Sequence, residues 1–255
     1  MPSAIKHDRE LAAKGLVTLL VEAQGANHTQ LEAFLWKTFP DNGCFTCVNV
    51  PVPIPRSGGI PHAGVIGVDG TLLWSGNPLG EPKRIEELVT AELDKVKKGW
   101  GATPTQKKVR AALFGKDNLA GAQALVTALP EGEERTLLQA EIDARYAAKK
   151  QAIPTLQQQG DWLGAQAAAK ALRKSVGEQA NWVAEVQPLL AAFDSEEGKA
   201  EIAAAVKLEK IVKQLRDKKG DGAPKALEAL LKTSASTKTG ARAQQLLDAL
   251  RTKVE

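Results

Sequence analysis

The sequence is poor in the features that mark several common protein classes. It contains two cysteines, which are too few for a scaffold held together by several disulfides. No apolar run approaches the roughly 18 residues that a membrane-spanning helix requires, so we expect no membrane span. The first residues carry charges of both signs, which does not fit a secretory signal.

The sequence also lacks the motifs of several enzyme classes. Ser57-Gly58-Gly59 is not followed by the Lys and Ser/Thr of a phosphate-binding loop. No Gly-x-Ser-x-Gly elbow of a serine hydrolase occurs. The chain has no second cysteine pair to complete a four-ligand zinc site, so a zinc site at Cys44 and Cys47 would need a second chain. We therefore expect neither a bound metal nor a cofactor.

The composition is ordinary for a globular protein. With 255 residues, 43% of them hydrophobic and 25% charged, the chain is expected to form one or two domains. Its net charge is +4, and the excess of Lys and Arg lies after residue 100. The basic residues between Lys207 and Lys219 alternate with acidic and apolar ones at a helical period. This pattern indicates a solvated helix face and argues against a nucleic-acid surface.

The composition changes near residue 100. Eight of the 13 prolines and both cysteines precede this point, and the later sequence is rich in Ala, Leu, Lys, Gln and Glu. Gly99 to Pro104 is the expected joint, because Gly and Pro end helices and Thr103 can start the next one. The sequence thus predicts an α/β domain over 1–99 and an all-helical domain over 104–255.

The first domain is expected to alternate short strands and helices. Apolar, β-branched runs predict the strands, and amphipathic patterns predict the helices. Asp69-Gly70 predicts a hairpin turn between two of the strands. The expected elements are a helix over 5–14, a strand over 16–21, a helix over 28–38, irregular or extended chain over 40–55, strands over 62–68 and 71–74, and a helix over 85–96.

The second domain is expected to be helical throughout. Several helices begin alike, with a polar residue followed by small residues and then leucines, as at Asp161-Trp162-Leu163-Gly164-Ala165. This pattern fits either a helical bundle or a short helical repeat. Pro188 is expected to kink or split its helix. The expected helices are 104–114, 117–129, 132–152, 161–176, 179–193, 195–218, 222–232 and 237–253.

The segment from Gly58 to Gly76, with Ile60-Pro61 before a strand, an Asp-Gly hairpin and a returning strand, resembles the thioredoxin-like superfamily. The likeness covers residues 4–98 and is greatest to redoxins and periplasmic thiol–disulfide reductases. It implies a cis peptide bond at Pro61, a substrate edge at Ile60 and Pro61, and an extracytoplasmic, periplasmic setting. The family's Cys-x-x-Cys follows a central strand, and that position would precede Met1. The domain is therefore expected to be incomplete at its N-terminus, with a gap in its sheet if that central strand is missing; Val48–Val52 is a candidate to fill the gap.

Cys44-Phe45-Thr46-Cys47 has the Cys-x-x-Cys spacing of redox sites. In such sites one thiolate attacks a partner disulfide and the other resolves the mixed disulfide. Three interpretations stay open: a structural or idle pair, a displaced redox pair, and half of a metal site. If the pair is active, Cys44 and Cys47 would exchange disulfides with a protein disulfide or a reductant. The alternative is a redox-inactive scaffold whose helical domain binds another protein.

Overall fold

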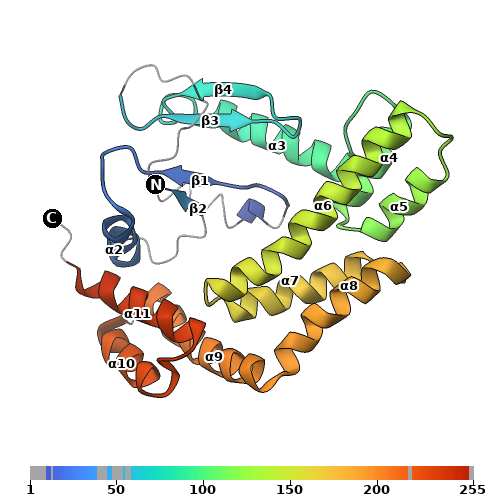
Figure 1. The fold of residues 1–255 in the computed structure, drawn as a ribbon. Helices are drawn as coiled ribbons and strands as arrows, with labels where there is room; N and C mark the ends of the chain where they lie inside the picture. The colour runs from blue at the N-terminus through green and yellow to red at the C-terminus, as the bar shows by residue number, and fades with distance from the viewer. Residues whose placement is uncertain are drawn as a thin grey trace. The chain divides into compact units, whose positions relative to one another are not determined.

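The computed structural model describes residues 10–12, 14–38, 45–47, 54, 59–217 and 220–252 (Figure 1). Its contacts divide the chain into two compact units. The first unit holds the described residues up to Ala23 and those between Gly43 and Leu138, and the second holds the remainder. The protein therefore combines a small mixed α/β region with a larger helical region, as the sequence predicts.

The first unit contains all of the strands in the described part of the chain. Its elements are β1 (Leu19–Val21), β2 (Phe45–Cys47), β3 (Ala63–Ile66), β4 (Leu72–Gly76), α3 (Pro82–Lys98), α4 (Pro104–Arg110), the π-helical turn η1 (Ala111–Gly115) and α5 (Leu119–Thr127). Helix α6 (Glu133–Gln158) begins in this unit and continues into the second.

The second unit is helical in its described residues. Besides α6, its elements are α2 (His28–Thr38), α7 (Trp162–Ser175), α8 (Ala180–Ala191), the 3-10 turn η2 (Ala192–Asp194), α9 (Glu196–Arg216), the 3-10 turn η3 (Gly220–Gly222), α10 (Ala223–Ser234) and α11 (Lys238–Arg251). Pro188 does not split α8, which continues to Ala191 before η2. None of the described helices is both long and apolar enough to cross a membrane.

The described strands form two separate pairs rather than one sheet. Strands β1 and β2 are parallel, with Val21 opposite Cys47. Strands β3 and β4 are antiparallel, with Val65 opposite Trp74. Strand β2 lies in the stretch that we expected to be irregular or extended. The segment Val48–Val52, which we considered as a filler of the sheet, lies outside the described residues.

The Asp69-Gly70 turn between β3 and β4 is confirmed. Gly70 N–H donates to the Gly67 carbonyl at 3.0 Å, and Thr71 N–H donates to Asp69 Oδ1 at 3.0 Å. Helix α3 is attached to this hairpin through Glu92, whose Oε2 accepts from the N–H of Val68 at 2.9 Å. The hairpin and α3 therefore pack against each other within the first unit.

The end of α3 packs tightly on the helix formed by α4 and η1. A Cβ atom at Gly99 would lie 1.8 Å from the Lys107 carbonyl oxygen, and one at Gly115 would lie 2.7 Å from the Val96 carbonyl oxygen. These glycines allow two backbones to approach each other more closely than any side chain permits. Because of this contact, α4 and α5 belong to the same compact unit as α3. The division by contacts thus falls near Leu138, whereas composition placed the joint at 99–104.

Four helix starts after residue 100 share one capping pattern. At each of these four, a short polar side chain accepts the N–H of a glycine three residues later, which satisfies a backbone donor that the helix leaves free. The cap and glycine pairs are Asn118 with Gly121, Asp161 with Gly164, Ser195 with Gly198, and Thr237 with Gly240. The shared helix starts seen in the sequence are therefore N-caps followed by a small residue at a crowded position.

Candidate functional site

Among the described residues of the expected redox site, Cys47 belongs to one strand pair and Ile60 and Pro61 precede the other. Cys47 ends β2, and Ile60 and Pro61 come just before β3. The Ile60–Pro61 peptide bond is cis, as the thioredoxin-like resemblance implies, and the Ile60 side chain is 66% exposed. Cys44 lies outside the described residues, and only the backbone of Cys47 is described. The described strands thus do not bring Cys47 and Pro61 into one sheet.

The strand conformation of β2 bears on disulfide formation. A disulfide requires Cα atoms within about 7 Å of each other, whereas three extended residues advance about 10 Å. A bridge between Cys44 and Cys47 would therefore require Phe45 and Thr46 to leave the extended conformation.

Oxidation of the cysteine pair is expected to open the β1–β2 pairing. Amide hydrogen exchange at Thr46 and Cys47 should be at least about tenfold faster in the oxidised protein, because local opening exposes their backbone donors. The β3–β4 hairpin should keep its protection and serves as the internal control. A doubly substituted C44S/C47S protein should not respond to oxidant. Equal exchange in the two redox states, with the disulfide verified by mass, would contradict this expectation.

The described residues contain no group of three or more His, Cys, Asp or Glu side chains that could hold a metal ion. The side chains of the cysteine pair lie outside the described residues, so the half-site interpretation stays a prediction.

A cluster of polar and aromatic groups joins α6 to α8 in the second unit. The Tyr146 hydroxyl donates to Glu185 Oε2 at 3.0 Å, and Lys150 Nζ lies 2.6 Å from the same oxygen. The Tyr146 ring stacks on Trp182 with ring centroids 5.1 Å apart. Because the polar groups satisfy one another, this cluster is a packing contact between two helices.

Tyr146 provides a spectroscopic test of this packing, since the chain has a single tyrosine. Burial, followed by the hydrogen bond to Glu185, raises the pKa of Tyr146 to about 12. An absorbance titration should give a midpoint near this value when folded, and near about 10 in denaturant. Because the folded pKa is raised, the stabilising effect is present below about pH 10 and is lost as the pH rises through the folded value. A folded midpoint near 10 would contradict the packing.

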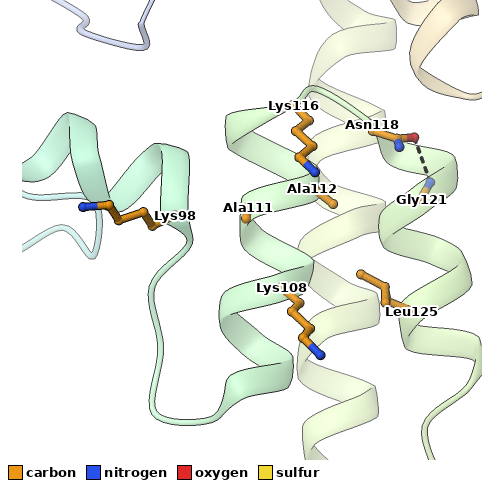
Figure 2. A pocket seen from close by; sticks show the side chains of 8 residues that line it. All are labelled: Lys98, Lys108, Ala111, Ala112, Lys116, Asn118, Gly121 and Leu125. Carbon is orange, nitrogen blue, oxygen red and sulfur yellow. Dashed lines mark hydrogen bonds between the residues drawn. The ribbon is translucent and has the colours of Figure 1, made fainter.

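A surface hollow lies within the first unit where α3, α4, η1 and α5 meet. It has a volume of about 370 Å³. Its lining residues are Lys98, Lys108, Ala111, Ala112, Lys116, Asn118, Gly121 and Leu125. Figure 2 shows Lys108 on α4, Lys116 just beyond the end of η1, and Leu125 across the hollow on α5. The floor is therefore apolar and built from small side chains, and its rim carries ammonium groups.

The three lysines at the hollow are not equivalent. Lys98 Nζ donates to Asp94 Oδ2 at 2.9 Å, and Figure 2 shows its ammonium group directed away from α4. This hydrogen bond lowers the pKa of Asp94. Lys108 and Lys116 are exposed and make no ion pair with any residue that the structure describes. The uncompensated positive charge of the hollow therefore belongs to Lys108 and Lys116.

The hollow lies within a run of sequence with one sign of charge. From Lys95 to Lys116 the chain carries seven Lys and Arg residues and no Asp or Glu; we call these residues the basic segment. This run was not among the features predicted from the sequence, where only the lysines of 207–219 were considered. A window count of acidic residues along the chain would have found it. That three of its lysines line one hollow became visible only when α3 was seen to pack on α4.

No protein-family model, curated protein sequence or solved structure matches this chain.

Proposed function

We propose that this protein is a binding module that engages an acidic protein partner through the basic segment, Lys95–Lys116. The supporting observation is the run of seven basic residues without an acidic one, several of which are exposed around the hollow. Like charges that lie close together repel one another. A negatively charged partner would offset this repulsion. Its binding would not require an ion pair at Lys108 or Lys116 to be broken. The interaction is therefore assigned to α3, α4 and η1 of the first unit.

Helix α9 shows what a solvated charged face looks like in the same protein. Its basic residues are interspersed with acidic ones, and they form ion pairs such as Lys199 with Glu196 and Arg216 with Glu209. Exposed pairs of this kind contribute little to stability and do not attract a partner. In the basic segment, Lys107, Lys108 and Lys116 have no such neighbours among the described residues. The contrast supports a binding role for the segment.

Binding of a fluorescent polyglutamate peptide tests this proposal. At about 50 mM salt, K107E/K108E/K116E should bind at least about tenfold more weakly than the unmodified protein, since each substitution replaces an attraction by a repulsion. Affinity should also fall between about 50 and 200 mM salt because exposed charges are screened. The matched control is K207E/K210E/K213E on α9, with the same charge change at exposed positions. Equal losses in the two triple variants would show a nonspecific charge effect and overturn the proposal.

Thiol–disulfide exchange by Cys44 and Cys47 is a second proposal. Cys47 ends a strand of a parallel pair, and ligands of α/β proteins often bind beyond the carboxyl ends of parallel strands. Its test is the redox equilibrium of the pair against glutathione. A potential between about −120 and −270 mV would support exchange activity, and one below about −300 mV would indicate a structural bridge.

A further inference from the structure

We propose that the partner segment is an acidic amphipathic helix that places one aliphatic side chain in the hollow and a carboxylate on each side of it. The two carboxylates pair with Lys108 and Lys116. This inference rests on the proposed function. It adds the kind of partner segment and the spacing of its acidic and aliphatic residues.

The floor of the hollow fits an aliphatic side chain. Ala111 and Ala112 leave space because their side chains are short, and Leu125 on α5 is 37% exposed beside them. The volume of about 370 Å³ exceeds that of a single leucine side chain. Contact with these residues would remove apolar surface from water on both partners, which favours binding.

The spacing of the two free lysines sets the spacing of the carboxylates. Lys108 lies on α4 and Lys116 directly follows the π-helical turn η1, so they are separated by about two helical turns, on the order of 10 Å. On a partner helix, residues seven positions apart lie on one face and are about 10.5 Å apart. A leucine between them, three or four residues from each carboxylate, faces the same way. The hollow therefore matches the pattern Glu-x-x-x-Leu-x-x-Glu.

One donor at the α5 end of the hollow is already used. The N–H of Gly121 donates to Asn118 Oδ1 at 2.8 Å, as the dashed line in Figure 2 shows, so it is not open to a partner carboxylate. The two ammonium groups are thus the cationic sites that remain for the partner.

The same surface is less suited to nucleic acid. Single-stranded nucleic acids are usually held by aromatic side chains on which bases stack, and the lining of the hollow contains no aromatic ring. A nucleic-acid backbone also has no aliphatic group to place between its charges. Charge and lining together favour the acidic peptide.

The experiment uses the full chain and three fluorescent probes of equal length at about 50 mM salt. The first is a helical peptide with the Glu-x-x-x-Leu-x-x-Glu pattern, the second has Ala in place of the Leu, and the third is polyglutamate. The Leu peptide should bind about tenfold more tightly than the Ala peptide, since it buries about three more methyl or methylene groups. K108E and K116E should each weaken the Leu peptide about tenfold, and K107E, on the same helix outside the hollow, less than threefold.

Ala111→Leu provides a variant without a charge change. It fills the floor of the hollow, so the Leu and Ala peptides should then bind equally, while polyglutamate binding stays unchanged. Circular dichroism verifies that each variant is folded.

Equal binding of the Leu and Ala peptides to the unmodified protein, with lysine-dependent binding of polyglutamate, would overturn this inference and leave the proposed function intact. No binding of any acidic peptide by the folded chain would overturn both. An oligonucleotide that binds more tightly than the Leu peptide, and whose binding is lost in K108E, would overturn this inference and identify nucleic acid as the partner.

Discussion

Replacing Gly99 by alanine is expected to lower the free energy of unfolding by at least about 3 kcal/mol. Gly99 has a φ angle of +81° and a ψ angle of +156°, a region that is essentially restricted to glycine and costs an L-residue about 1–3 kcal/mol. Its added Cβ would also lie 1.8 Å from the Lys107 carbonyl oxygen and 2.6 Å from that carbonyl carbon. Both are backbone atoms, so α3 and α4 must move apart, and overpacking of this kind costs about 1–3 kcal/mol.

Gly70→Ala separates the two costs. Gly70 has nearly the same φ angle, +83°, and a Cβ there would meet nothing within 4 Å. It should therefore show the conformational cost alone, about 1–2 kcal/mol. Urea unfolding followed by circular dichroism measures both variants. If Gly99→Ala and Gly70→Ala destabilise the protein equally, the close contact between α3 and α4 does not exist in solution.

Glu201→Ala is expected to destabilise the protein by about 2–5 kcal/mol, because it leaves two backbone N–H donors without their acceptor, at about 1–3 kcal/mol each. Glu201 is 2% exposed. Its two carboxylate oxygens accept the N–H groups of Lys238 at 2.6 Å and of Thr239 at 3.0 Å. These N–H groups lie in the first turn of α11, where a helix has no internal acceptors and where negative charge is favourable. Without the carboxylate, the buried donors lose their partner.

Two further variants distinguish the charge from the side chain. Glu201→Gln keeps one acceptor oxygen but turns an NH₂ group toward a donor, so an intermediate loss of about 2 kcal/mol is expected. Glu209→Ala on the same helix removes an exposed carboxylate paired with Arg216, and it should cost no more than about 1 kcal/mol. Thermal unfolding compares the three proteins. A loss for Glu201→Ala no larger than that for Glu209→Ala would show that α9 does not hold α11 through this carboxylate.

The helices of the second part were predictable because their signals are local. The expected helix over 161–176 corresponds to α7, Trp162–Ser175, and the one over 237–253 to α11, Lys238–Arg251. In both, a polar cap lies one residue before the helix and satisfies its first free donors. The end of α6 was placed too early, at 152, because the helix continues through Pro154 to Gln158. Tertiary packing can outweigh the local cost of an interior proline.

The pairing of strands and the division into units were not predictable in the same way. Strand β2 has three residues and lies near prolines, and it pairs with β1 across 26 positions, Leu19 with Phe45. Such a pairing depends on long-range contacts that no local pattern records. The composition near residue 100 showed where helices become dominant. It did not show that Gly99 and Gly115 would bring α3 against α4 and η1.

The sequence by itself determined which segments become helices, where they begin, and that a run of 22 residues carries only positive charge. Spacing of apolar residues, caps and charges along the chain is enough for these properties. Tertiary structure alone decided that Glu201 is buried under α11 and that Lys108 and Lys116 flank an apolar hollow. Burial and the shape of a binding surface depend on which elements touch, and that is set by the free energy of packing distant segments together.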